Sequence, residues 1–250
     1  MGEVILTMKG IDKSFPGVHA LDHVDLEIRK GEVLALMGEN GAGKSTLMKV
    51  LTGIYKKDSG TITYEGKEIE FANPRDAQAA GVVIVHQELN MMNHLTVAQN
   101  IFIGREIMNG KLINDDKMNK EAAKLFDRLN IKIDPTEKMG NLTVGRQQMC
   151  EIAKAISHDA KVIIFDEPTR GIDVGAKKEI YSFMDNLTKQ GKAIIMISSE
   201  MPEIIGMSDR IYVMRDRKIV KELKAEEATQ ELILSYALEG AREEDEHAEA

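Results

Sequence analysis

An α/β fold with a mostly parallel sheet and an antiparallel β edge is predicted by two patterns in the sequence. Residues 3–15 and 19–28 alternate apolar and polar positions, as half-buried antiparallel strands do. Continuous apolar runs are instead typical of parallel strands that are buried on both faces. Four such runs are present, at residues 33–37, 82–85, 162–165 and 193–197.

Helical patterns alternate with these runs, which is the arrangement expected of an α/β core. They cover about residues 44–52, 116–130, 146–157, 175–190 and 201–206. Residues 61–71 predict a hairpin around Glu65 and Gly66. The last segments, 210–223 and 225–238, predict a hairpin followed by a helix.

A single domain over residues 1–238 is the organisation that these elements favour. The segment from about 88 to 158 shows no strand pattern, and we expect it to form a helical subdomain between two core strands. Residues 239–250 hold six acids and one arginine, a net −5 of the total charge of −8. This acidic tail is expected to be solvated and disordered. The remaining body is close to neutral, which argues against broad nucleic-acid binding.

The composition excludes several other classes of protein. Hydrophobic residues make up 43% of the chain and charged residues 30%, as in globular domains. The longest apolar runs reach about five residues, whereas a membrane-spanning helix needs roughly 20. No secretory leader pattern is visible. The single cysteine, Cys150, allows no intramolecular disulfide, and the six histidines show no metal-ligand spacing, so we interpret them as surface or core residues.

A phosphate-binding loop is predicted directly after the apolar run at 33–37. Nine consecutive residues match G-x-x-x-x-G-K-[ST] and its following threonine: Gly38, Glu39, Asn40, Gly41, Ala42, Gly43, Lys44, Ser45 and Thr46. Glycines let such a loop approach phosphates closely, and the amides that open the next helix attract anions. Lys44 can reach the β- and γ-phosphates of a nucleotide, and Ser45 can ligate Mg²⁺. The alternative is a glycine-rich turn without a ligand.

Two acids end a later apolar strand and complete the expected nucleotide site. Asp166 follows Val162–Phe165 and is placed to hold Mg²⁺. Glu167 comes next and can polarise an attacking water. Alone this pattern also fits a strand end that faces solvent, but together with the phosphate loop it predicts nucleotide hydrolysis.

The order of these and four further features resembles that of the ATP-binding-cassette (ABC) ATPases over about residues 3–224. The resemblance implies that Phe15 packs on adenine and that Gln87, in Val85–Glu88, acts in catalysis and on Mg²⁺. It also implies that Asp173 lies in the D-loop. The segment that would contact the ATP of a partner cassette, the signature, is Leu142, Thr143, Val144, Gly145 and Arg146.

Three of these assignments have simpler alternatives. Gln87 could be a polar residue that closes a strand, and Phe15 could be a core residue. Asp173 could cap the helix that begins near Gly175, a role compatible with the first.

Monosaccharide importers of the ribose/galactose type are the group that the chain resembles most. The segments that carry this resemblance are 13–26, 37–62, 86–90 and 142–155. Members of this group usually carry two cassettes in one chain. Up to about residue 160 the sequence resembles the N-terminal cassette, whereas 166–181 and 197–214 resemble the C-terminal one. We interpret the chain as a hybrid that is joined near 156–169.

The resemblance also implies partners and a location. Two cassettes, identical or related, would bind two ATP between them in a head-to-tail dimer. ATP binding would close this dimer, and membrane permease subunits would convert the closing of the dimer into sugar movement. A periplasmic or extracellular sugar-binding protein would act indirectly. The expected location is the cytoplasmic face of the cell membrane, with the permease contact near residues 88–105.

Three residues depart from the family pattern and suggest an alternative function. Val144 and Arg146 stand where many signatures have Gly and Gln. Ser199 stands where the family usually has a switch histidine, and loss of such a group typically slows hydrolysis by about 10²–10⁴-fold. The alternative to an ATPase is therefore a nucleotide-dependent dimerisation module. A guanine-specific enzyme is disfavoured, since no N-K-x-D segment follows the acidic strand.

Overall fold

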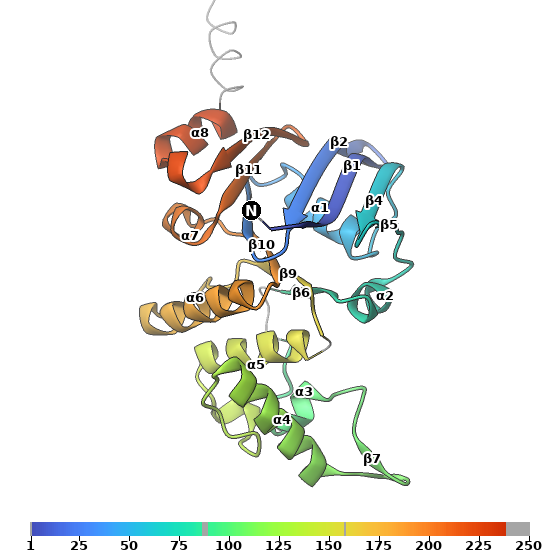
Figure 1. Cartoon of the computed structure of the whole chain (residues 1–250), viewed down its shortest axis with the longest axis vertical. Helices are drawn as coiled ribbons and strands as arrows, with labels where there is room; N and C mark the ends of the chain where they lie inside the picture. Colours follow the sequence, from blue (N-terminus) through green and yellow to red (C-terminus); the bar gives the residue numbers. More distant parts are fainter. Residues whose placement is uncertain (1, 87–89, 158, 239–250) are drawn as a thin grey trace, which may run out of the picture.

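Two sheets and a set of helices make up the computed structural model, which describes residues 2–86, 90–157 and 159–238 (Figure 1). The central sheet contains β3 (Val33–Gly38), β6 (Val82–Val85), β9 (Val162–Asp166), β10 (Ala193–Ile197), β11 (Arg210–Arg215) and β12 (Lys218–Lys224). Their order across the sheet is β12-β11-β3-β10-β9-β6. All neighbours pair parallel except β11 and β12, which are antiparallel. The predicted fold class is confirmed.

Alternate residues of the central strands belong to two different cores. In β3, Val33 and Ala35 pack into the core that the sheet shares with the helices that follow β6 in the chain. Leu34 and Leu36 pack into the core shared with the second sheet. A strand points successive side chains to opposite faces, so burial on both faces requires the continuous apolar runs seen in the sequence.

The second sheet is antiparallel and contains β1 (Val4–Phe15), β2 (Val18–Arg29), β4 (Ser59–Tyr64) and β5 (Lys67–Glu68), in the order β2-β1-β4-β5. The predicted hairpin is confirmed between β4 and β5. Its two turn residues, Glu65 and Gly66, have φ angles of 48° and 76°. A two-residue type I′ turn requires positive φ at both positions, and its backbone twist matches the twist of the two strands that it connects.

The helices are α1 (Lys44–Leu51), α2 (Pro74–Ala79), α3 (Val97–Ile101), α4 (Asp115–Leu129), α5 (Val144–Ile156), α6 (Val174–Lys189), α7 (Met201–Met207) and α8 (Gln230–Leu238). Two 3₁₀ turns lie at Met139–Asn141 and Ala225–Glu227. Helices α3, α4 and α5 gather at the lower end of the molecule in Figure 1 and lie between β6 and β9 in the chain.

The expectation that 88–158 contains no strand was wrong in one place. A small hairpin, β7 (Met108–Asn109) and β8 (Leu112–Ile113), projects from this region (Figure 1). Strands of two residues are too short to produce an alternating pattern. Helix α5 also begins two residues earlier than predicted, at Val144.

Helices α2 and α3 had no counterpart in the prediction, although each carries a start signal. Asn73 caps α2 just before a proline, and Thr96 and Gln99 form a capping box at α3. Both helices are too short for a clear period of apolar residues.

Across the described ranges, no helix combines the length and the apolar character needed to cross a membrane. The acidic tail, 239–250, lies outside the described residues, so its predicted disorder stays a prediction.

A buried ion pair joins the start of β11 to the turn between β2 and β3. The guanidinium of Arg210 on β11 donates to both carboxylate oxygens of Glu32, at 2.8 and 3.0 Å, and to the Glu27 carbonyl at 2.7 Å. Only 4% of the Arg210 side chain and 9% of the Glu32 side chain are exposed. A charge buried in this way is tolerated only with its partner in place.

We predict that Arg210→Met lowers the free energy of unfolding by about 3–5 kcal/mol, because the Glu32 carboxylate would stay buried without its ion-pair partner. Lys189→Met is the matched control, since it breaks the exposed pair with Asp185 and should cost less than about 1 kcal/mol. Urea unfolding of the three proteins measures both values. Equal losses in the two variants would contradict the prediction.

Candidate functional site

A cleft of about 990 Å³ opens at the carboxyl edge of β3, β9 and β10. Parallel strands direct their carboxyl ends to one edge of a sheet, which is where α/β proteins bind ligands. Many of the predicted site residues line this cleft: Phe15, Gly38, Glu39, Asn40, Gly41, Gly43, Lys44, Ser45, Thr46, Asp166, Glu167 and Ser199. Ala42 does not, because its side chain is buried beneath the loop.

The glycines of the loop serve two different purposes. A Cβ on Gly38 would lie 2.3 Å from the Met214 carbonyl, and one on Gly43 would lie 2.9 Å from the Ala20 carbonyl. These two glycines therefore let the loop pack on β11 and β2. A Cβ on Gly41 would meet no atom within 4 Å, so this position faces open space.

Lys44 is held by the loop that it follows. Its Nζ donates to the carbonyls of Gly38 at 2.6 Å and Glu39 at 2.9 Å. Partial burial lowers the pKa of Lys44, although Glu167 and Asp166 act in the opposite direction. The first amides of α1 have no acceptor within the helix, so the loop and the helix together present donors and a cation to the cleft.

The two acids face the loop from the end of β9. Burial and the neighbouring Glu167 raise the pKa of Asp166, whereas His86 and Lys44 act to lower it. Glu167 has a φ of 50°, and its amide donates to the Ile197 carbonyl at 2.8 Å. A non-glycine residue in this left-handed region stores strain of a kind found at active sites.

Ser199 lies where the resemblance placed the switch position. Its hydroxyl donates to Glu167 Oε2 at 3.0 Å, and the side chain is exposed in the cleft. The structure therefore brings together Ser199 and the acid that is expected to activate water.

Glu203 is a residue that sequence reasoning missed. Its carboxylate is buried and accepts hydrogen bonds from Thr169, at 2.9 Å, and from Ser198. Thr169 follows β9 and Ser198 follows β10, so Glu203 ties together the two loops that carry Glu167 and Ser199. The contact with Thr169 joins positions 34 residues apart, which no local pattern reveals. Arg170 and Arg217 also line the cleft and were not expected.

Phe15 is half-buried at one end of the cleft. Its ring contacts Tyr55 edge-to-face, with ring centroids 5.0 Å apart, and Lys13 lies over the ring at 5.4 Å. The residue thus lines the cleft rather than the core, while its predicted contact with adenine stays a prediction.

The signature residues lie away from the cleft. Thr143 caps α5 through its backbone, and Val144 is 55% exposed. A Cβ on Gly145 would lie 2.5 Å from Cβ of Ala176, so this glycine allows α5 to approach α6. Arg146 lines a separate pocket of about 430 Å³ next to α6, and Leu142 is buried.

Asp173 caps α6, as its simpler alternative predicted. Its carboxylate accepts from the amides of Gly175 and Ala176, both at 3.0 Å. The side chain remains exposed, so a D-loop role toward a partner is compatible with this geometry. Gln87 lies outside the described residues, and its role stays a prediction.

Comparisons with known proteins agree with this arrangement. Residues 21–170 match the ABC transporter family. The chain belongs to the ABC transporter family. Its fold is similar to that of an ATP-binding cassette of an ABC transporter crystallised in its ADP conformation, with a TM-score of 0.80, 28% identity, and coverage of 94% of this chain and 95% of that one.

Curated relatives of this ABC cassette are named as sugar importers. The chain is 48% identical over 233 residues to a putative ribose/galactose/methyl galactoside import ATP-binding protein 2 of Burkholderia cenocepacia, covering 92% of this chain and 46% of that protein. It is 45% identical over 237 residues to the xylose import ATP-binding protein XylG of Geobacillus kaustophilus, covering 94% and 47%. The chain thus spans about half the length of the curated relatives it matches.

We predict that Glu167→Gln lowers the pKa of Asp166 toward its ordinary value, because a neighbouring negative charge is removed. Lys44→Met should raise that pKa further, since a nearby positive charge is lost. Carboxyl-carbon NMR titration of the nucleotide-free protein measures both shifts. An unchanged Asp166 pKa in Glu167→Gln would show that burial alone sets it.

Proposed function

We propose that this ABC cassette binds Mg-ATP in the cleft and hydrolyses it. The observation that carries the proposal is the meeting of the phosphate loop and the Asp166–Glu167 pair across one cleft. The loop amides and Lys44 supply positive charge for phosphates. An arriving phosphate would replace the Gly38 and Glu39 carbonyls as the partner of the Lys44 ammonium.

The chemistry of the donor set fits Mg²⁺. Ser45 offers a hydroxyl and Asp166 a carboxylate, and both line the same cleft. Oxygen ligands of this kind, supplemented by substrate phosphates, are those that Mg²⁺ prefers. Gln87 would add an amide oxygen. When bound, the ion would neutralise charge that develops on the phosphates during transfer.

Glu167 is the proposed general base for the attacking water. The hydrogen bond from Ser199 orients its carboxylate, and the contacts of Glu203 hold the loops that carry both residues. Ser199 has no ring nitrogen with which to carry a proton, so its contribution is limited to a hydrogen bond.

A second cassette is needed to complete each ATP site in this proposal. The signature, residues 142–146, lies outside the cleft of its own chain but begins α5, where free amides attract anions. In a head-to-tail dimer the Thr143 hydroxyl and these amides would face the γ-phosphate held by the partner, with Asp173 nearby. The dimer is formed by two copies of this chain or by a related cassette.

Monosaccharide import is the process that the proposed ATPase would power. Support comes from the names of the relatives, which mention ribose, galactose, methyl galactoside or xylose. Membrane permease subunits, and indirectly a periplasmic or extracellular sugar-binding protein, would then be the partners. The cassette would act at the cytoplasmic face of the membrane.

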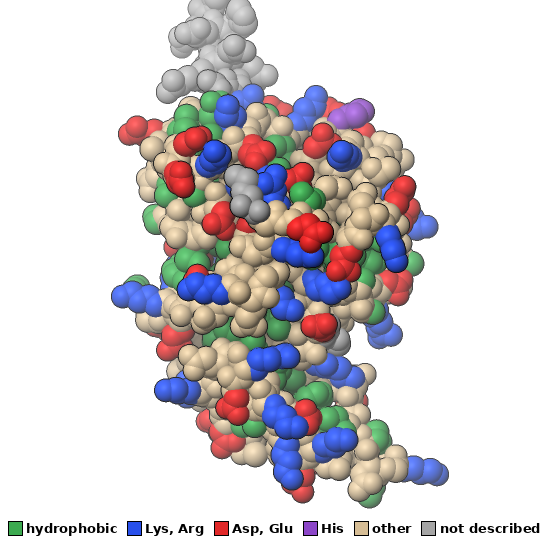
Figure 2. Space-filling view, in the orientation of Figure 1, with side chains coloured by type: hydrophobic (Ala, Val, Ile, Leu, Met, Phe, Trp, Pro, Cys, Tyr) green, Lys and Arg blue, Asp and Glu red, His purple; other side chains and the backbone are tan. Residues whose placement is uncertain are grey.

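A binding module with little hydrolysis is the second candidate, and Ser199 is the observation that favours it. Such a module would close on ATP without useful turnover. A third class, ATPases that act on nucleic acid, is less favoured. Acidic and basic side chains are interspersed on the face shown in Figure 2, and the net charge is −8.

We predict that phosphate release from Mg-ATP rises faster than linearly with protein concentration, because two chains form each site. Lys44→Ala should abolish the activity, since the loop loses its cation. Measuring release over a wide concentration range tests both points.

Two results would count against this proposal. A wild-type rate equal to that of Lys44→Ala would favour the binding module. A rate that is strictly proportional to protein concentration would show that the active species does not form by association of two chains in the concentration range measured.

We further predict that Ser199→His raises kcat by about 10²-fold or more, because imidazole can orient water and transfer a proton. Ser199→Ala is the matched control, since it removes the hydroxyl without adding a ring, and it should not raise kcat. Steady-state kinetics with saturating Mg-ATP gives the comparison. Turnover that is already fast and insensitive to Ser199→His would show that the serine suffices.

A further inference from the structure

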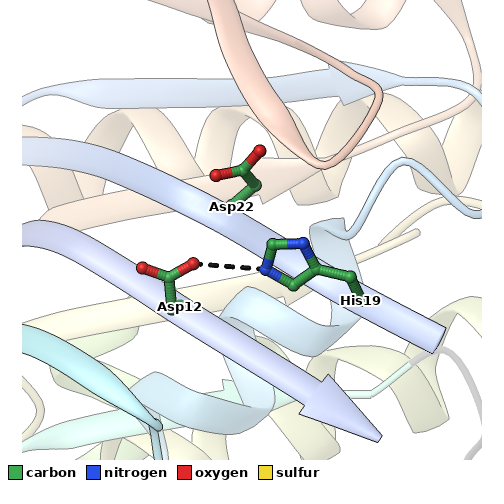
Figure 3. A group of neighbouring side chains, drawn as sticks. All are labelled: Asp12, His19 and Asp22. Atoms are coloured by element: carbon green, nitrogen blue, oxygen red, sulfur yellow. Dashed lines mark hydrogen bonds and ion pairs between the residues drawn. The ribbon is translucent and has the colours of Figure 1, made fainter. Parts of the chain in front are cut away.

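Three side chains on the β1–β2 ladder bring carboxylate and imidazole ligands together outside the nucleotide cleft (Figure 3). Asp12 lies on β1, and His19 and Asp22 lie on β2. One ligand atom from each lies within 4.8 Å of the other two. Asp12 Oδ1 and His19 Nε2 are 3.2 Å apart.

A second imidazole lies at the same place. The Nδ1 of His23 is 3.4 Å from Asp12 Oδ2 and 2.8 Å from Asp22 Oδ1. Its side chain is 77% exposed, so the ring can turn without disturbing the core. The group thus offers two imidazoles and two carboxylates.

The separations suit a four-coordinate metal ion. With metal–ligand bonds of about 2.0–2.1 Å, neighbouring ligands of a tetrahedral site lie about 3.3 Å apart. Asp12 Oδ1 lies 3.2 Å from His19 Nε2, and Asp12 Oδ2 lies 3.4 Å from His23 Nδ1, so each imidazole already has this separation from a different oxygen of the carboxylate. The two histidine side chains are 43% and 77% exposed, so small rotations of their rings would adjust the rest.

We propose that Asp12, His19 and Asp22, with His23 as the fourth donor, bind a divalent transition-metal ion of the zinc class. Imidazole ligands favour this class over Mg²⁺ or Ca²⁺, which take oxygen ligands. Two carboxylates balance the charge of the ion. This site is separate from the Mg²⁺ site proposed for the nucleotide cleft.

Neighbouring contacts hold the ligands in place. Ser59 Oγ donates to Asp12 Oδ2 at 2.9 Å, and the Asp22 amide donates to the Arg217 carbonyl at 3.0 Å. Outer contacts of this kind orient metal ligands. The Lys218 ammonium lies 2.9 Å from Asp22 Oδ2 and competes with the ion, but 55% of its side chain is exposed and it can swing away.

The position of the group links it to the nucleotide cleft. Val18 and Ala20, on either side of His19, line that cleft, as does Arg217. A bound ion would tie β1 to β2 at this point, so we expect it to stabilise the folded chain and the cleft wall formed by these residues.

Titration of Zn²⁺ into the nucleotide-free full chain, in competition with a chromogenic chelator, tests the proposal. We expect one zinc ion per chain and a rise in melting temperature. His19→Ala should weaken the affinity at least about tenfold and remove the thermal shift. Co²⁺ supplies a second readout, because a tetrahedral site produces visible absorption that His19→Ala should abolish.

His94→Ala and His247→Ala are the matched controls, because each removes an imidazole that lies elsewhere in the sequence. Both should bind zinc like the wild type, and circular dichroism verifies that all variants are folded. The proposal is overturned if wild type shows no saturable binding, if His19→Ala binds as tightly as wild type, or if a control variant loses the site instead.

Discussion

The pairing of β10 with β3 on one side and β9 on the other is the interaction on which the candidate site depends. In this register Ile197 stands opposite Leu36 in one direction and Asp166 in the other. Because all three strands run parallel, the phosphate loop, the two acids and Ser199 all emerge at one edge. A slip of one residue would exchange the side chains that face the two cores and remove this alignment.

Two buried polar contacts brace the central sheet, one at each end of its parallel strands. Glu203 holds the loops after β9 and β10 together at the carboxyl edge, whereas Arg210, the first residue of β11, pairs with Glu32, just before β3, at the amino edge. Both involve carboxylates that are costly to bury unless fully partnered. The Glu203 contacts therefore tie the stability of the fold to the positions of Glu167 and Ser199.

The interpretation of the chain as a hybrid of two cassettes stays a prediction, and the structure shows where its two parts would meet. The predicted join lies near 156–169, and β9 begins within it. Val162 of β9 pairs with Val82 of β6 and with Ala193 of β10, which belong to different parts. Both parts would thus share one sheet and both of its cores, rather than form separate units.

The sequence by itself determined the parallel core, the antiparallel edge, the phosphate loop and the Asp166–Glu167 pair, because each depends on local spacing or on an unbroken apolar run. Short elements such as α2, α3 and the β7–β8 hairpin escaped, since they hold too few residues for a period. Only the tertiary structure decided which side chains meet: Ser199 with Glu167, Glu203 with Thr169, and, across the β1–β2 pair, the histidines with Asp12 and Asp22. Their spacing along the chain carries no signal, because it is strand pairing and loop packing that set the distances between them.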